Sequence, residues 1–314
     1  MNTITHTRSF KTLRISLTGL CNLGCVYCTT SNEKKSMDTL SPLEVDELAE
    51  IVKELHQTLN LNTIRLTGGE PTLFPKLTIL IEKIADLGIP VKMTTNAFHA
   101  EKISKNLSDA GLKAVNISLD ALNEEVFQKI SKRKNLQKVL NNIEDYLASG
   151  IETKLNSVIV NGVNSCEIIP LLEYAQKLNV PIRFLELMKM GHLFSSGHDQ
   201  YFISENDILQ IIKSKYNFIK NIREAHATAH YFTLDNGYKF GLISNESEPF
   251  CDDCDRLRLD IYGNIYGCLS SNTPINIAKL QKSSALDDAL ENALLQKQKQ
   301  KFSGSTLSMM AIGG

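Results

Sequence analysis

Residues 12–28 read TLRISLTGLCNLGCVYC, and this stretch sets both the first element of the fold and the first candidate site. Its beginning alternates apolar and polar residues, as expected of a β-strand. Cys21, Cys25 and Cys28, here called the first triad, then follow in a C-x3-C-x2-C pattern. Three closely spaced thiols directly after a strand predict a loop that wraps one metal centre.

The first triad favours an iron–sulfur cluster over zinc. Tetrahedral structural zinc takes four protein ligands, and neither a histidine nor a fourth cysteine lies near these residues in the sequence. A four-iron cluster held by three cysteines leaves one iron without a protein ligand, where a small molecule can bind and react. A structural zinc loop or ordinary core cysteines are the alternatives.

Strand-like runs alternate with segments of helical period over the first 190 residues. The runs cover residues 12–18, 63–68, 89–96, 114–120, 153–160 and 182–187. Ser41, Pro42 and Glu44 predict a helix start with an N-cap, a proline at N1 and a capping-box acid. Six such units predict a parallel sheet with right-handed crossovers. They are too few for a complete eight-stranded barrel, so we expect an α/β fold, an open (β/α)6 TIM-like partial barrel, with a doubly wound sheet as the alternative.

The pattern changes beyond Gly191. A polar, irregular segment is followed by a helix-like stretch near 204–216 and by alternating runs at 230–243 and 256–268. Gly263-Asn264 predicts a hairpin turn within the last run. We therefore expect a core domain over 1–195 and a smaller C-terminal α+β domain over 196–314.

The C-terminal region carries a second triad, Cys251, Cys254 and Cys268, with C-x2-C-x13-C spacing. Such spacing also occurs in zinc ribbons, for which Cys166 is a conceivable fourth ligand. Cys166 begins a predicted helix far from the triad in sequence, so we expect it to be a small buried residue.

Composition excludes several classes of function. Lys and Arg number 34 against 35 Asp and Glu, a net charge of −1 that gives no reason to expect nucleic-acid or membrane binding. No stretch reaches the roughly 18 apolar residues of a membrane span. The N-terminal residues lack the apolar core of an export signal, so we expect a cytoplasmic protein whose cysteines bind metal rather than form disulfides.

Cations lie on or beside the predicted strands, where they are unusual unless they face a cavity or reach solvent. They are Arg14, Arg65, Lys154, Arg256 and Arg258. Arg256 and Arg258 are two residues apart, so on one strand they share a face. Guanidinium groups that converge on one cavity suit a polyphosphate, whereas surface ion pairing is the alternative for each residue alone.

Two features resemble the radical S-adenosylmethionine superfamily. Tyr27 precedes the last cysteine of the first triad, and Gly68-Gly69-Glu70-Pro71 ends the second predicted strand. The resemblance implies that a [4Fe-4S] cluster on the first triad binds S-adenosylmethionine and cleaves it to a 5′-deoxyadenosyl radical. It also implies that the GGE motif contacts the methionyl amino group.

A narrower resemblance to the GTP 3′,8-cyclase family of molybdenum cofactor biosynthesis covers almost the whole chain. It includes the segment FCDDCDRLRLDIYGNIYGCLS at 250–270 and the terminal Gly313-Gly314. It implies a second [4Fe-4S] cluster on the second triad, approached by the guanine base. It further implies a C-terminal tail that inserts into the active site.

The same resemblance implies individual ligand contacts. For S-adenosylmethionine these are Tyr27, Gly69, Ser118 and Met188. For GTP they are Arg14, Arg65, Thr94, Lys154, Arg256, Leu257 and Arg258. Asn156 and Arg183 are expected at the site without an assigned ligand. The chain departs from the family at Gly19-Leu20, usually Asp-Arg, and at residues 72–74, where an arginine is usual after GGEP. These departures concern the identity of the substrate.

The implied reaction converts GTP into (8S)-3′,8-cyclo-7,8-dihydroguanosine 5′-triphosphate. Its implied partners are a downstream cyclic pyranopterin monophosphate synthase, an electron donor such as flavodoxin or ferredoxin, and a second copy in a homodimer. A paralogue that acts on another nucleotide by the same chemistry is one alternative. A non-enzymatic iron–sulfur electron carrier or interaction protein is another.

Overall fold

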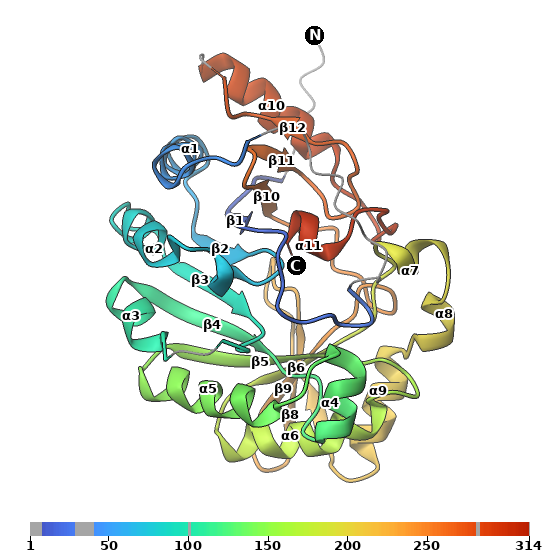
Figure 1. The fold of residues 1–314 in the computed structure, drawn as a ribbon. Coiled ribbons are helices and arrows are strands. Elements are labelled where there is room, and N and C mark those ends of the chain that lie inside the picture. Colours follow the sequence, from blue (N-terminus) through green and yellow to red (C-terminus); the bar gives the residue numbers. More distant parts are fainter. Residues whose placement is uncertain (1–7, 29–40, 100–101, 281–282, 314) are drawn as a thin grey trace.

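The computed structural model describes residues 8–28, 41–99, 102–280 and 283–313 and contains one curved sheet of twelve strands (Figure 1). The strand order is β12-β11-β10-β1-β2-β3-β4-β5-β6-β9-β8-β7. The central six strands are β1 (Thr12–Ser16), β2 (Thr63–Thr67), β3 (Val91–Thr95), β4 (Leu112–Ser118), β5 (Glu152–Val158) and β6 (Ile182–Leu185). The others are β7 (Phe218–Lys220), β8 (His230–Leu234), β9 (Lys239–Ile243), β10 (Arg256–Asp260), β11 (Asn264–Tyr266) and β12 (Ile275–Asn276).

Strands β1 to β6 are parallel and adjacent in chain order. A doubly wound sheet instead reverses its strand order at a switch point, so the predicted partial barrel is confirmed and the doubly wound alternative is wrong. Each of these six strands lies within, or within two residues of, its predicted run.

Helices cover the outer face of the barrel portion (Figure 1). They are α1 (Val45–Leu59), α2 (Leu77–Ala85), α3 (Ser104–Asp109), α4 (Glu124–Ser131), α5 (Leu136–Ala148) and α6 (Ile168–Lys177). Alternate residues of the strands, such as Leu13 and Ile64, are fully buried in the core beneath these helices. The residues between them are mostly polar and face the inside of the curve, here called the lumen. The fold therefore surrounds a polar space with an apolar shell.

The start of α1 differs from the sequence-based expectation. Glu44, rather than Ser41, is the N-cap, and it forms a capping box with Glu47. Leu43 N donates to the carbonyl oxygen of Ile261 at 2.8 Å. This bond holds the preceding residues against the C-terminal part of the chain, so the helix begins three residues later than an N-cap at Ser41 would require.

The C-terminal region extends the sheet at both edges. β9 pairs in parallel with β6, and β10 pairs in parallel with β1. β10 and β11 form the predicted hairpin, with Gly263 in the turn and Asn264 as the first residue of β11. The sheet thus continues across residue 195, and the division into domains of 1–195 and 196–314 stays a prediction.

The remaining helices include the tail of the chain. They are α7 (His192–Ser195), α8 (His198–Tyr201), α9 (Glu205–Lys213), α10 (Ser283–Leu295) and α11 (Met309–Ile312). Residues after α10 return past α7, where Ser305 bridges Met190, and α11 then packs against β1 and β10 inside the curve (Figure 1). None of the helices in the described ranges has the length and apolarity needed to cross a membrane.

Candidate active site

The first triad lies at the carboxyl end of β1, on a loop held by helix α4. The backbone N–H groups of Gly24 and Val26 donate to carbonyl oxygens in the last turn of α4, at 2.8 and 3.0 Å. Burial, Asp120 and the other two thiols of the triad hold the pKa of Cys25 well above its usual value. All three cysteines of the first triad therefore lie on this one loop.

The GGE segment is packed directly against the cysteine loop. Gly69 N donates to the carbonyl oxygen of Thr18 at 2.6 Å, and Glu70 N donates to that of Leu20 at 2.8 Å. A Cβ atom at Gly69 would lie 2.2 Å from the Leu20 oxygen. Only glycine fits where the two backbones come this close. The packing of the protein therefore requires glycine at position 69, independently of any ligand.

Glu70 links the carboxyl ends of β2 and β3 by hydrogen bonds. Its buried carboxylate accepts hydrogen bonds from Thr72, from Thr95 Oγ1 (2.7 Å) and from Asn96 N (2.7 Å). Asn96 Nδ2 in turn donates to Cys21 Sγ at 3.6 Å. Glu70 therefore organises the surroundings of the first triad through the protein's own hydrogen bonds.

Tyr27 and Asp120 tie the cysteine loop to the end of β4. Tyr27 donates its hydroxyl proton to Asp120 Oδ2 at 2.7 Å, and Val158 N donates to Asp120 Oδ1 at 2.9 Å. Burial raises the pKa of Asp120 to about 6, although both hydrogen bonds oppose this shift. The protein's own hydrogen bonds therefore fix the Tyr27 side chain without any ligand.

Four cations stand side by side on neighbouring strands at one level of the lumen. Arg14 is in register with Arg258 on one side and with Arg65 on the other, and Arg65 is in register with Lys92. Within the described ranges, no carboxylate forms an ion pair of 4.0 Å or less with any of these four residues or with Arg256. Their charges are therefore not balanced by acidic side chains in direct contact.

The electrostatics of these cations indicate an anion site. Burial, then the charges of Arg258, Arg256 and Arg65, hold the pKa of Arg14 well below its usual value. Burial lowers the pKa of Arg65 and that of Arg258 to about 10 each. Arg14 Nε and Arg183 Nη2 are buried without a hydrogen-bond partner. Buried donors that stay unsatisfied are costly, so a polyanion in the lumen would relieve both effects.

The other expected ligand residues lie at successive levels of the same lumen. Thr94, Asn116 and Lys154 are in register across β3, β4 and β5, and Lys154 forms an ion pair with Glu152 at 2.8 Å. Ser118, Asn156 and Arg183 are in register one level further along, and Arg183 Nε donates to Asn156 Oδ1 at 2.9 Å.

Two expected contacts lie elsewhere. The Leu257 side chain is fully buried in the core on the face of β10 opposite Arg256 and Arg258, so it does not face the lumen. Met188 is half-buried and packs with Met190, Tyr266, Phe302 and Ile312 beside the tail. A ligand contact from Leu257 would therefore have to come from its backbone.

The second triad differs in its electrostatics from the first. Burial, then the neighbouring thiols, raises the pKa of Cys251 to about 11. Burial also acts to raise the pKa of Cys254, but Arg256 and Lys297 outweigh it, and the pKa falls to about 7. Cys254 thus sits in a cationic environment that favours a thiolate, the form in which cysteine binds metal.

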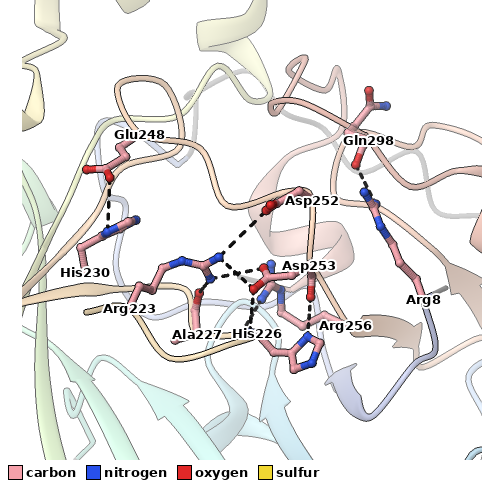
Figure 2. A network of polar contacts seen from close by, with 10 residues as sticks. All are labelled: Arg8, Arg223, His226, Ala227, His230, Glu248, Asp252, Asp253, Arg256 and Gln298. Atoms are coloured by element: carbon pink, nitrogen blue, oxygen red, sulfur yellow. Dashed lines mark hydrogen bonds and ion pairs between the residues drawn. The ribbon is translucent and has the colours of Figure 1, made fainter. Parts of the chain in front are cut away.

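A polar network braces the loop that carries Cys251 and Cys254 (Figure 2). Arg223 contacts both carboxylate oxygens of Asp253, at 3.2 and 2.8 Å. His226 N donates to the same carboxylate at 2.8 Å, and Arg256 Nη1 donates to the carbonyl oxygen of His226 at 3.4 Å. The segment between β7 and β8 therefore holds the cysteine loop from one side.

Cys166 does not belong to either triad. It is exposed in a short 3-10 turn, Ser165–Glu167, so the prediction of a small buried residue is wrong. The neighbouring Glu167 turns inward instead and accepts a hydrogen bond from Leu122 N at 2.7 Å. In the part of the chain that the structure describes, no three His, Cys, Asp or Glu side chains are grouped so that they could hold a single metal ion.

The C-terminal tail enters the lumen beside the arginines. Arg258 Nη1 donates to the carbonyl oxygens of Ile312 (3.2 Å) and Gly313. Gly313 has a φ of +71°, and a Cβ atom there would lie 2.2 Å from Thr67 Oγ1, so glycine is required on both counts. Gly314, the other residue expected in the tail, lies outside the described residues.

Sequence reasoning missed three residues of this region. Lys92 lies two residues before Thr94 on the same strand, so strand alternation was a sufficient signal. Asp120 and Lys297 gave no such signal, because their partners Tyr27 and Cys254 are remote in sequence.

Comparisons with known proteins agree with this geometry. The profile of the Radical SAM superfamily matches residues 15–175, and that of Molybdenum Cofactor Synthesis C matches residues 180–305. The crystal structure of Streptococcus suis SuiB bound to S-adenosylmethionine superposes with a TM-score of 0.68 at 14% identity. It covers 91% of this chain and 68% of that one, and at this identity it supports the fold alone.

The fold and the cysteine loop thus define a radical S-adenosylmethionine protein. Two curated relatives, both named GTP 3′,8-cyclase, are more informative about the family. That of Campylobacter curvus is 38% identical over 84% of this chain and 82% of its own length. That of Nautilia profundicola is 33% identical over 90% and 88%. The chain belongs to the GTP 3′,8-cyclase family of the radical S-adenosylmethionine superfamily.

Proposed function

We propose that this protein converts GTP into (8S)-3′,8-cyclo-7,8-dihydroguanosine 5′-triphosphate for molybdenum cofactor biosynthesis. The assignment of a triphosphate rests on four cations that lie in register on neighbouring strands: Arg258, Arg14, Arg65 and Lys92. Within the described residues, none of them has a carboxylate partner. Several guanidinium groups around one space are suited to bind phosphate oxygens in pairs.

The first triad fits a [4Fe-4S] cluster with one open iron, which is the part that S-adenosylmethionine requires. When bound, this cluster supplies the electron that splits S-adenosylmethionine and so starts the reaction. The protein's own contribution is positioning. We expect Tyr27, Gly69, Ser118 and Met188 to contact S-adenosylmethionine, and Asp120 fixes Tyr27.

The second triad fits a second [4Fe-4S] cluster, because the Cys254 thiolate is stabilised beside the strand that carries Arg256 and Arg258. These two arginines, with Arg14, Arg65, Thr94 and Lys154, would hold GTP. The tail occupies part of the hydrogen-bonding capacity of Arg258, and the remaining donors of this guanidinium are left for the nucleotide. The tail also helps to exclude water from the radical chemistry.

In the cell, we expect the electron to come from a flavodoxin or ferredoxin and the product to pass to a cyclic pyranopterin monophosphate synthase. We also propose that the protein acts in the cytoplasm and as a homodimer. The electron donor and the synthase follow from the assigned reaction, which leaves an oxidised cluster and an unfinished pterin precursor after each turnover.

The function is tested by an anaerobic single turnover of reconstituted protein with dithionite, S-adenosylmethionine and GTP. Mass spectrometry should detect 5′-deoxyadenosine together with an isomer of GTP mass. Deoxyadenosine without that isomer would contradict GTP as the substrate. Neither product, from protein with iron bound at both triads, would contradict the enzyme assignment and favour a carrier.

Iron content provides the first quantitative prediction. Two four-iron clusters require about eight irons per chain after anaerobic reconstitution. Removing the second triad by Cys251→Ala and Cys254→Ala together should lower the content to about four. A plateau near four in the unmodified protein would contradict the second cluster.

The second quantitative prediction concerns Arg256 and Arg258. Arg256→Ala and Arg258→Ala each remove a charge-assisted contact worth about 1.5–3 kcal/mol, so GTP should bind roughly 10- to 150-fold more weakly. Calorimetry should find S-adenosylmethionine affinity nearly unchanged in both variants. Lys239→Ala, at an exposed position at the start of β9, is the matched control with unchanged GTP affinity. If neither arginine variant weakens GTP binding, the triphosphate site is misassigned.

A further inference from the structure

One lysine contacts a sulfur of the second triad. Lys297 Nζ donates to Cys254 Sγ at 3.1 Å and to the carbonyl oxygen of Arg256 at 2.6 Å. The same ammonium group stands 5.0 Å from the centre of the Phe10 ring. Lys297 thus links the end of helix α10, a cysteine sulfur and the first residue of the strand that carries the arginine pair.

The charge of Lys297 has no acidic partner in the described part of the chain. No carboxylate there forms an ion pair with it, and the groups that raise its pKa against the effect of burial are the sulfurs of Cys254 and Cys268. A half-buried ammonium group normally seeks a carboxylate or water. Here the Cys254 sulfur, rather than a carboxylate, is the partner of the Lys297 ammonium group.

The surroundings keep Lys297 in this position. Gln296 accepts a hydrogen bond from Gly267 N at 2.8 Å and donates to the carbonyl oxygen of Thr273 at 2.9 Å. On the other side, Arg8 Nη1 donates to the carbonyl oxygen of Gln298 at 2.9 Å (Figure 2). Both neighbours of Lys297 are therefore tied to other elements, and the ammonium group is held over the sulfur rather than swinging free in solvent.

We propose that Lys297 is a positioning residue that raises the reduction potential of the second cluster by donating a hydrogen bond and a positive charge to the Cys254 sulfur. The proposal rests on the proposed function, which assigns a cluster to this triad. Reduction adds one electron, and hence one negative charge, to the cluster. A cation and an N–H donor at a ligand sulfur stabilise that extra charge, so they favour the reduced form.

The test is a redox titration of the full chain followed by electron paramagnetic resonance, with dithionite as the reductant. Cys21, Cys25 and Cys28 are replaced by serine in every sample, so that iron is bound only at the second triad. Lys297→Met, which keeps the length of the side chain, should lower the ratio of reduced to oxidised cluster at least tenfold at a fixed potential. For a one-electron couple this corresponds to a fall of about 59 mV. Lys297→Arg, which keeps the charge and the donors, should stay within threefold of the parent.

Lys299→Met is the matched control, since it removes the same charge from an exposed position two residues along the chain. It should leave the ratio within twofold. An unchanged potential in Lys297→Met with iron still bound would overturn the inference alone. An equal shift in Lys299→Met would overturn it as well, because the effect would then be one of net charge. Absence of iron from the parent triad would overturn it together with the second cluster of the proposed function.

If Lys297→Met does not retain iron, Lys297→Gln decides the matter, because it keeps an N–H donor while losing the charge. A potential equal to the parent value in Lys297→Gln would show that the charge of Lys297 does not act on the cluster, and it would overturn the inference. A potential below that of the parent supports the inference.

Discussion

Cys21→Ala should abolish the formation of 5′-deoxyadenosine, whereas Cys251→Ala should retain it and lose the conversion of GTP. The two outcomes differ because the first triad lies beside the GGE segment and Tyr27, while the second lies beside the strand of Arg256 and Arg258. Anaerobic assays with dithionite should therefore show deoxyadenosine without a GTP isomer for the second variant. Such uncoupled cleavage is expected when the radical is generated but its target is misplaced.

Cys166→Ala is the matched control for both variants. This cysteine is exposed and lies outside both triads, so its loss should change neither product. Equal loss of deoxyadenosine in Cys21→Ala and Cys251→Ala, with each remaining cluster intact, would contradict the division of roles between the two triads.

Gly69→Ala should disrupt the first site as a whole. The new Cβ atom would lie 2.2 Å from the carbonyl oxygen of Leu20. This oxygen belongs to the backbone, so no side-chain rotation can relieve the clash. The two strand-end hydrogen bonds to Thr18 and Leu20 must then open, at a cost of about 1–3 kcal/mol or more. We expect iron content at the first triad to fall and S-adenosylmethionine to bind roughly 10- to 100-fold more weakly.

Gly19→Ala provides the comparison within the same loop. A Cβ atom at Gly19 meets nothing within 4 Å, and its φ lies outside the left-handed region. Iron content and affinity for S-adenosylmethionine should therefore stay close to those of the unmodified chain. If Gly69→Ala binds S-adenosylmethionine as tightly as Gly19→Ala, the close packing of the two backbones does not matter for the site.

The barrel and the lumen were predictable because each depends on local pattern. Alternation in TLRIS and TIRLT places Arg14 and Arg65 on the face opposite their buried leucines and isoleucines, and the register of adjacent parallel strands then brings the two arginines together. The cysteine spacings were equally local. The helix caps were less predictable, because the start of α1 depends on a bond from Leu43 to Ile261.

The pairing of β10 with β1 was not predictable from pattern, and neither was Lys297. Both depend on segments that meet only in the folded chain, and no periodicity or spacing encodes such a meeting. The same holds for Asp253, whose role as the partner of Arg223 is visible only once the segment between β7 and β8 is placed.

The position of β1 between β2 and β10 also bears on how the molecule is made. During synthesis, β1 to β6 emerge first, and one edge of β1 stays unpaired until β10 has been translated. Long-range pairing of this kind is slow, and an open strand edge is prone to pair with another chain. The nascent protein therefore carries an aggregation risk for most of its translation, and stop codons before residue 256 should yield insoluble fragments rather than smaller working enzymes.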